Sequence, residues 1–446
     1  MKRTRYSIAL AVLALLVSGC GSTAANVSAP PATSPNSPAS PVSAGAAATP
    51  IKIGVIEPTT GTSAELGKDN EEGLRLFLSS VDDTVAGRKI EAVFADDQGK
   101  PDVALTKAKA LVENDHVQVL MGMNHTPVCY AVAQYVKQAQ VPLLVTGNCS
   151  AQNLTTSPQF ASPYLARFTQ TSSGMADPLA DWASKQGYHK AVLITSDYGG
   201  GLEEGDAFAS AFIERGGTIV QELHPAQGTA DFGPFLAQLD RTADVVTTFL
   251  PGTDGLHFGE QYGDYATQHK PQILDITGVM TKGPSLVQLK QKAEGIVATN
   301  TYSQAYDSPM NRAYIARLHT KYPDRFPSAD IAAGYSAGQI LAAALERVSG
   351  RIEDKQQFLD ALYATDMPTV RGPIRLDDHH DVVEDVYVYR IISNGGPMLQ
   401  KLEQTYKGVT QFWDFTPSQT ARLQIGQMKG KWSAMTKTQL DQLMGQ

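Results

Sequence analysis

Short apolar runs rich in β-branched residues alternate with amphipathic stretches along most of the chain beyond residue 50. The run at 51–56 predicts a buried strand, and the stretch at 71–81 predicts a helix because Leu74, Leu76 and Phe77 would face inward from it. The same pattern recurs as strands and helices at 90–94, 102–113, 117–121, 128–138, 143–145, 191–195, 203–214, 218–223, 232–239, 245–249, 273–277 and 295–299. Strands and helices that alternate at this spacing form parallel sheets covered on both faces, so we predict an α/β fold.

The predicted strands, about ten in number, would make too wide a sheet for one compact domain. The 396 residues beyond residue 50 (446 − 50) are also more than one core usually serves, so we expect two sheets in two lobes. The pattern then changes to helices and a strand pair at 310–321, 329–348, 355–364, 372–376 and 384–392. Ligands bind at the carboxyl ends of parallel strands, and two facing lobes would place these ends around a shared cleft.

The first fifty residues have a different character. Lys2, Arg3 and Arg5 precede an apolar run at 8–17 that is too short to span a bilayer. The residues before Cys20 match the lipobox of bacterial lipoproteins, which implies cleavage of a signal peptide at 1–19 and lipid on the Cys20 thiol. An ordinary signal peptide with a chance cysteine, or an uncleaved anchor, is the alternative. The Pro-, Ser- and Ala-rich residues up to 50 predict a disordered tether.

The rest of the composition is that of an ordinary soluble globule, with 42% hydrophobic and 18% charged residues overall. A net charge of −8 argues against binding of nucleic acid and against electrostatic attachment to a membrane. With Cys20 taken by lipid, Cys129 and Cys149 form an even pair in an exported chain. Either a disulfide joins the two cysteines, or each is a small buried side chain without a bridge, and the sequence leaves both possibilities open.

One motif has the form of a catalytic nucleophile. Residues 334–338 match G-x-S-x-G, in which Ser336 would be the nucleophile of an α/β-hydrolase. That role needs a buried strand directly before the serine, but residues 330–333 continue smoothly into the predicted helix. Ser336 would therefore lie within a helix, among small packing residues. We expect no catalytic residue, and a secreted serine hydrolase remains only as an alternative.

Two other motifs suggest ligands but have the wrong spacing. Gly199, Gly200 and Gly201 follow a predicted strand and open a helix, yet the next glycine, Gly205, does not complete G-x-G-x-x-G. The acidic and histidine residues at 377–381 are consecutive, so they would point to opposite faces of a strand and could not converge on one ion. We expect a polar hairpin turn there, and neither a cofactor nor a metal.

A further set of short segments occurs in a fixed order, at 51–55, Gly61, Gly67, Asp96-Asp97, Gly122, 142–146, Leu154-Thr155, Asp197-Tyr198-Gly199 and 371–377. Their order and spacing resemble the type I periplasmic binding proteins of the leucine/isoleucine/valine-binding class, over about residues 51–400. The resemblance implies a two-lobed receptor that closes on a small solute and delivers it to an ABC permease.

The resemblance also implies which residues of the first lobe bind the solute. Loops after the third and fourth strands hold a carboxylate in this family, and the matching positions are Asn124, Thr126, Asn148 and Ser150. Hydroxyl groups and the backbone N–H groups of a helix start suit an anion without needing an arginine. Thr126 and Ser150 also stand where helix N-caps are expected, so an ordinary structural role stays open.

In the second lobe, Tyr198 matches an aromatic residue that covers the ligand, and Asp254 lies on another loop facing the cleft, although it too could be an N-cap. Amino-acid-binding members hold the ammonium group with an acidic residue, and Thr277 takes that position here. An unpaired buried ammonium is costly, so this change disfavours amino acids unless Asp254 or Asp275 substitutes. Leu66 replaces an aromatic residue of the first lobe. The expected ligand is a branched-chain amino acid or an aromatic or other organic acid.

The sequence thus predicts a two-lobed solute receptor on the outer face of a bacterial cell membrane, anchored by lipid at Cys20. We expect a monomer whose partners are a small solute and an ABC permease, with a sensory receptor of the same fold as the alternative. The predicted lobes are residues 51–167 with 302–380, and residues 168–301 with 381–446, joined by three hinge crossings. Binding would close the lobes about that hinge.

Overall fold

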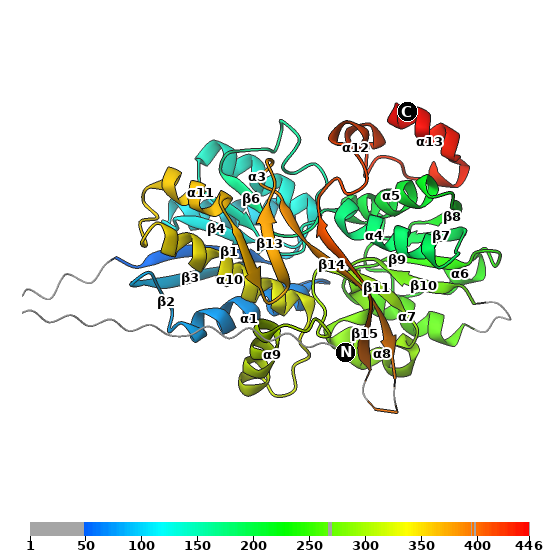
Figure 1. Cartoon of the computed structure of the whole chain (residues 1–446), viewed down its shortest axis with the longest axis horizontal. Coiled ribbons are helices and arrows are strands. Elements are labelled where there is room, and N and C mark those ends of the chain that lie inside the picture. The colour runs from blue at the N-terminus through cyan, green and yellow to red at the C-terminus, as the bar shows by residue number, and fades with distance from the viewer. Residues whose placement is uncertain (1–48, 266–269, 394, 397, 446) are drawn as a thin grey trace, which may run out of the picture. The chain divides into compact units, whose positions relative to one another are not determined.

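The first predicted strand, β1 (Ile51–Glu57), lies inside a six-stranded sheet because its side chains are buried on both faces. The strands follow the order β2-β3-β1-β4-β5-β6, and every neighbouring pair is parallel except β2 and β3. The other five strands are β2 (Thr84–Val85), β3 (Arg88–Asp96), β4 (Val119–Gly122), β5 (Leu143–Val145) and β6 (Leu165–Arg167). We call this sheet and its helices the first lobe (Figure 1).

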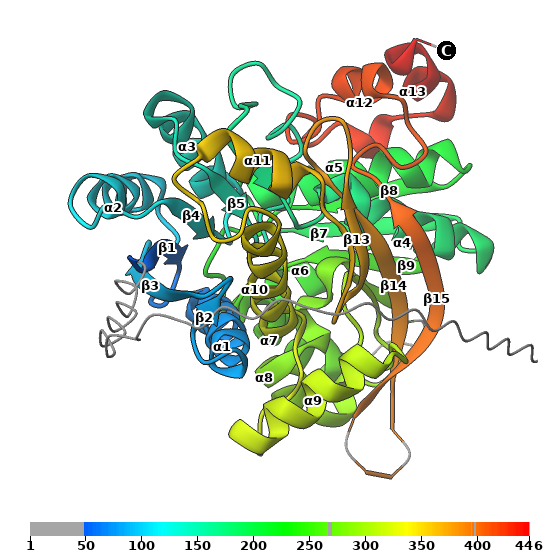
Figure 2. The same ribbon diagram turned by 60° about the vertical axis from the view of Figure 1, so that its left-hand side comes forward.

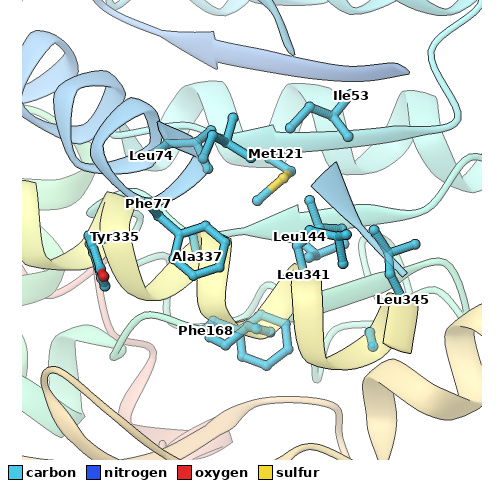
Figure 3. Close-up of a cluster of buried hydrophobic side chains, with 14 of the residues drawn as sticks. Ile53, Leu74, Phe77, Met121, Leu144, Phe168, Tyr335, Ala337, Leu341 and Leu345 are labelled. Carbon is cyan, nitrogen blue, oxygen red and sulfur yellow. The ribbon is translucent and has the colours of Figure 1, made fainter. Parts of the chain in front are cut away.

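The helices of the first lobe come from two separate parts of the chain. They are α1 (Ala64–Ser80), α2 (Pro101–Glu113), α3 (Thr126–Ala139), α9 (Pro309–Lys321), α10 (Ala329–Arg347) and α11 (Lys355–Tyr363). The core lies between α1, α10 and the sheet; Figure 3 shows there Leu74, Phe77, Tyr335, Leu341 and Leu345 with Ile53, Met121 and Leu144. The amphipathic stretches predicted from the sequence therefore bury their apolar faces as expected.

The packing of α10 against α1 also explains the G-x-S-x-G motif. A Cβ atom on Gly334 would overlap the Asn70 carbonyl group of α1, so glycine lets the two helices approach closely. Ser336 is buried within α10, where its hydroxyl donates to the Ala333 carbonyl oxygen at 2.9 Å and accepts from Arg371 Nε at 2.9 Å. The serine is thus a packed helix residue and does not stand on a strand-to-helix turn.

The second lobe is built on a nine-stranded sheet with the order β12-β13-β14-β11-β10-β9-β7-β8, in which β15 also pairs with β14. Its strands are β7 (Lys190–Thr195), β8 (Thr218–Leu223), β9 (Val245–Phe249), β10 (Gln272–Asp275), β11 (Val297–Asn300), β12 (Asp366–Thr369), β13 (Gly372–Leu376), β14 (Val382–Ile392) and β15 (Leu399–Val409). The strands from β7 to β11 are parallel, as predicted.

The strands from β12 to β15 form the antiparallel part of this sheet, because they pair antiparallel with one another and β14 pairs antiparallel with β11. Short connections can join only antiparallel neighbours, and the predicted polar turn at 377–381 joins β13 to β14 in this way. Figure 2 shows β13, β14 and β15 side by side. The predicted strand at 273–277 is also too long, since β10 ends at Asp275.

Helices cover this second sheet: α4 (Ser172–Lys185), α5 (Gly199–Glu214), α6 (Gly233–Ala237), α7 (Thr253–Asp264), α8 (Gly283–Leu289), α12 (Pro417–Leu423) and α13 (Lys437–Met444), with 3₁₀ turns η1 (Ile276–Thr281), η2 (Lys290–Ala293) and η3 (Trp432–Ala434). The last of these elements pack onto the second lobe, because α13 contacts α5 and η3 contacts β8. Figure 1 shows α12 and α13 beside α5.

The strand β14 belongs to both lobes. Its first residue, Val382, packs in the core of the first lobe with Val370 and Ile374. Val386 and Val388, further along β14, pack in a core of the second lobe. The predicted lobe boundary at residue 380 separates β12 and β13 from β14, to which they are hydrogen-bonded, although their side chains pack against the first lobe.

This computed structural model describes residues 49–265, 270–393, 395–396 and 398–445. The predicted lipidation site Cys20 and nearly all of the predicted tether lie outside the described residues. Within the described ranges, no helix combines the length and the apolar composition needed to cross a membrane.

Candidate functional site

A cavity lies between the two lobes, where the carboxyl ends of both sheets meet. From the first lobe it is lined by Leu66 and by loop residues after β4 and β5, namely Asn124, His125, Thr126, Asn148 and Ser150. The second lobe contributes residues after β7, β9, β10 and β11, and its lining includes Tyr198, Glu204, Phe249, Pro251, Thr277, Val279, Lys282, Asn300 and Thr301. Thr169, Gln170 and Met175 complete the lining from the segment that follows β6. The predicted location of the site therefore matches a cavity of the described chain.

Six of the seven residues predicted to bind the ligand line this cavity: Asn124, Thr126, Asn148, Ser150, Tyr198 and Thr277. Asp254 does not. The chain leaves β9 through Pro251 and Gly252, which has φ +64, and begins α7 at Thr253. Asp254 in the first turn of α7 then accepts a hydrogen bond from the Gly228 backbone N–H at 2.9 Å. Its carboxylate thus holds a neighbouring loop, and the N-cap of α7 is Gly252 and not Asp254.

The two ligand loops of the first lobe are packed tightly against each other. Gly122 ends β4 with φ +109, and Met123 follows with φ +74, so the chain turns sharply toward Asn124. A Cβ atom on Gly147 would overlap the Met123 carbonyl group, which makes glycine necessary there. The Asn148 backbone N–H donates to Asn124 Oδ1 at 3.0 Å and joins the loops directly.

A disulfide ties the same two loops together. Cys129 lies in α3, which begins at Thr126, and Cys149 lies between Asn148 and Ser150. Both cysteines are fully buried. The bridge therefore fixes the start of α3 relative to the loop after β5, which resolves the two possibilities that the sequence left open.

Asn124 is held in place by a hydrogen bond to the buried side chain of Glu57. Its Nδ2 donates to Glu57 Oε2 at the end of β1. Burial, and then the nearby Asp97 carboxylate, raise the pKa of Glu57 well above its ordinary value. Burial also lowers the pKa of His125 to about 4, so this histidine is neutral at pH 7. The first-lobe side of the cavity thus offers uncharged amide, hydroxyl and imidazole groups, which suit a ligand carboxylate.

Lys282 is the one lysine or arginine among the described residues that line the cavity. Its Nζ lies 3.0 Å from Asp330 Oδ2, and the two side chains are only 8% and 2% exposed. Asn148 Nδ2 also donates to Asp330 Oδ1. Because Asp330 belongs to α10 and Lys282 lies between η1 and α8, the ion pair joins the two lobes beside the cavity.

Glu204, on α5, is the acidic residue of the lining. It is fully buried, and neither carboxyl oxygen has a hydrogen-bond partner of normal geometry among the described residues. Burial raises its pKa well above the ordinary value, and the hydroxyls of Ser150 and Ser172 lie close enough to oppose that shift in part. The sequence predicted a helix at 203–214 but gave no sign that Glu204 faces the cavity, because its neighbours come from distant parts of the chain.

Thr277 occupies a left-handed backbone conformation with φ +62, inside the 3₁₀ turn that follows β10. Asn300 Nδ2 donates to its carbonyl oxygen at 2.7 Å. The nearby Asp275 does not line the cavity, because Asp275 Oδ2 accepts from the Met280 backbone N–H at 2.7 Å beneath the turn. Neither of the two aspartates that could have replaced the missing acid at 277 therefore reaches the lining.

Two α/β lobes that meet at a cavity lined by both polar and apolar side chains, at the carboxyl ends of both sheets, define a two-lobed solute receptor of the type I periplasmic-binding-protein fold. The chain belongs to the periplasmic binding protein family, whose model matches residues 50–397. Its relatives place it in the leucine/isoleucine/valine-binding class of that family.

A curated relative, the Leu/Ile/Val-binding protein homolog 6 of Brucella melitensis biotype 1, is 28% identical over 364 residues, covering 80% of this chain and 92% of its own. An ABC transporter substrate-binding protein from Sphaerobacter thermophilus has a similar structure, with a TM-score of 0.76 and 30% identity over 81% of this chain and 98% of that one. A solute-binding protein from Rhodopseudomonas palustris BisB5, solved with 3,4-dihydroxybenzoic acid, gives a TM-score of 0.74 and 29% identity over 81% and 98%.

Proposed function

We propose that this chain is the solute-binding lipoprotein of an ABC importer and that it captures an aromatic or similar organic carboxylate by closing its two lobes. The observation that carries the proposal is the lining itself. Neutral amide and hydroxyl groups from Asn124, Thr126 and Asn148 suit a carboxylate, and Met175 and Phe249 offer apolar surface for the body of the ligand.

The residue at 277 supports an organic acid over an amino acid. An amino acid brings a buried ammonium group, which needs an anionic partner. Thr277 supplies none, and Asp254 and Asp275 accept backbone hydrogen bonds outside the cavity. The relative from Rhodopseudomonas palustris, solved with 3,4-dihydroxybenzoic acid, is consistent with this choice.

Isothermal titration calorimetry of the purified full chain against benzoate, hydroxybenzoates, leucine and valine tests the proposal. We expect at least one aromatic acid to bind and to raise the free energy of unfolding by about 2.7 kcal/mol at 100 times its Kd. Tighter binding of leucine or valine than of every aromatic acid would contradict the choice of ligand. No binding of any of these solutes would contradict the proposal as a whole.

The proposed role in import and the lipid anchor have tests of their own. Deleting the gene should abolish uptake of the radiolabelled ligand that calorimetry identifies, whereas a purely sensory receptor would leave uptake unchanged. Replacing Cys20 by serine should move the chain from the membrane fraction to the soluble fraction, because the thiol that would carry the lipid is lost. Mass spectrometry of the mature N-terminus reports the lipid directly.

A further inference from the structure

We propose that Glu204 contacts the bound solute and selects ligands that carry a hydroxyl group in addition to their carboxylate. This inference rests on the proposed function, since it assigns a specificity-determining residue to the same cavity. Glu204 combines three properties: its carboxyl group is fully buried, it lines the cavity, and it lacks a partner of normal geometry among the described residues.

The other two buried acids on the same helix have partners, unlike Glu204. Glu203 accepts from the Tyr130 hydroxyl at 3.0 Å and from the Gln152 backbone N–H at 3.1 Å. Asp206 accepts from the backbone N–H groups of Gly426 and Met428 and from the Trp432 indole. Buried carboxyl groups are normally satisfied in this way, so an unpartnered one that faces a cavity points to a partner supplied by the ligand.

The surroundings of Glu204 favour its neutral form. Burial is the main cause of its raised pKa, which the Ser150 and Ser172 hydroxyls oppose and the nearby Glu203 and Asp177 carboxyl groups increase. Ser172 Oγ also donates to the Ser150 carbonyl oxygen at 3.2 Å, so its proton is shared between two acceptors. Among the described residues, no lysine or arginine forms an ion pair with Glu204.

A neutral carboxyl group has one oxygen that donates and one that accepts. A ligand hydroxyl has the complementary pair, because it accepts with its lone pairs and donates its proton. One hydroxyl could therefore satisfy both oxygens of Glu204, whereas a C–H group at the same place would leave Glu204 with only the Ser150 and Ser172 hydroxyls beside it. Unpaired buried polar groups give strong discrimination against a ligand that lacks the matching group.

The solute's carboxylate has a different place in the cavity. Lys282 and Asn148 are both bound to Asp330, whereas Glu204 lies beside Ser150 and Ser172, so a solute whose carboxylate is held by Asn124 and Asn148 would meet Glu204 with another of its groups. The chemistry that fits these two parts together is a hydroxylated aromatic acid. The solved relative with 3,4-dihydroxybenzoic acid carries both groups on its ligand.

The test compares selectivity and not affinity alone. Calorimetry on the full chain measures Kd for benzoate and for 2-, 3- and 4-hydroxybenzoate with the wild type, Glu204→Gln and Glu204→Leu. We expect the wild type to bind at least one hydroxybenzoate tenfold or more tightly than benzoate. Glu204→Leu should reduce that ratio to below threefold, and Glu204→Gln should keep part of it, because an amide also donates and accepts.

Asp254→Asn is the matched control, since Asp254 is also buried, has one carboxyl oxygen without a partner among the described residues and does not line the cavity. It should leave the ratio unchanged. A ratio that survives in Glu204→Leu, or a wild type that does not distinguish benzoate from any hydroxybenzoate, would overturn the role of Glu204 while leaving the receptor function intact. The wild type could instead bind leucine more tightly than every hydroxybenzoate and lose this binding in Glu204→Leu. That result would assign Glu204 to an ammonium group and overturn both proposals.

Discussion

Replacing Lys282 by methionine should weaken ligand binding much more than it weakens the fold. The lysine pairs with Asp330 at 3.0 Å in a nearly buried contact between the lobes. Methionine keeps most of the apolar stem of the side chain but removes the charge. Asp330 would then retain only the hydrogen bond from Asn148.

Removing one partner of a buried ion pair costs about 3–5 kcal/mol, because the remaining charge is left uncompensated. In the form described here that cost falls on the contact between the lobes. When the lobes separate, water can solvate Asp330 and most of the cost disappears. Since about 1.4 kcal/mol corresponds to a tenfold change, we expect the ligand Kd to rise by about 100- to 1,000-fold. The melting temperature of the ligand-free protein should change little.

The assay is calorimetry with the ligand found for the wild type, together with thermal melting without ligand. Lys292→Met is the matched control, because Lys292 forms a 2.8 Å ion pair with Asp264 that is 38% and 72% exposed and lies within the second lobe. It should change Kd by less than threefold. The double variant Lys282→Met with Asp330→Asn should recover much of the lost affinity. A Kd for Lys282→Met within threefold of the wild type would refute this reasoning, and so would equal losses in binding and in ligand-free stability.

Three further predictions concern other parts of the structure. Thr277→Glu should create an anionic partner in the cavity lining, so calorimetry should show leucine or valine binding gained and aromatic acids weakened at least tenfold; unchanged preferences would contradict the role given to this position. Replacing both Cys129 and Cys149 by alanine opens a bridge between residues 20 apart, which should lower the free energy of unfolding by about 3 kcal/mol in denaturant titrations, and an unchanged value would show that the bridge does not stabilise the fold. The melting temperature should fall from pH 5 to pH 8, because burial raises the pKa of Asp275 and of Glu384 to about 7 and the folded chain then holds protons that the unfolded chain has released; a flat or rising profile would contradict this.

The sequence predicted the parallel part of the fold well, because each strand and helix there has its own apolar pattern. The run at 51–56 became β1 and the stretch at 102–113 became α2. The helix α4 gives no such signal, since it is buried around most of its circumference and contains Pro178. The strand β15 was also missed, because its alternation is weak and its register is set by pairing with β14.

The site could be predicted only in part. Loop residues such as Asn124 and Asn148 were located through the family resemblance, and they line the cavity. The role of Lys282 depends on Asp330, which lies 48 residues further along the chain. Glu204 is distinguished from Glu203 only by what each contacts, and this follows from packing and not from residue type.

The path of β14 limits how this protein can be divided or recombined. The chain crosses between lobes after β6, after β11 and again within β14, whose side chains pack first in one core and then in the other. No single cut can release either lobe as an independently folding fragment. A chimaera that exchanges one lobe with that of a relative would need three junctions, and the one within β14 would have to match two cores at once. Specificity is therefore more readily transferred by changing residues that line the cavity than by exchanging lobes.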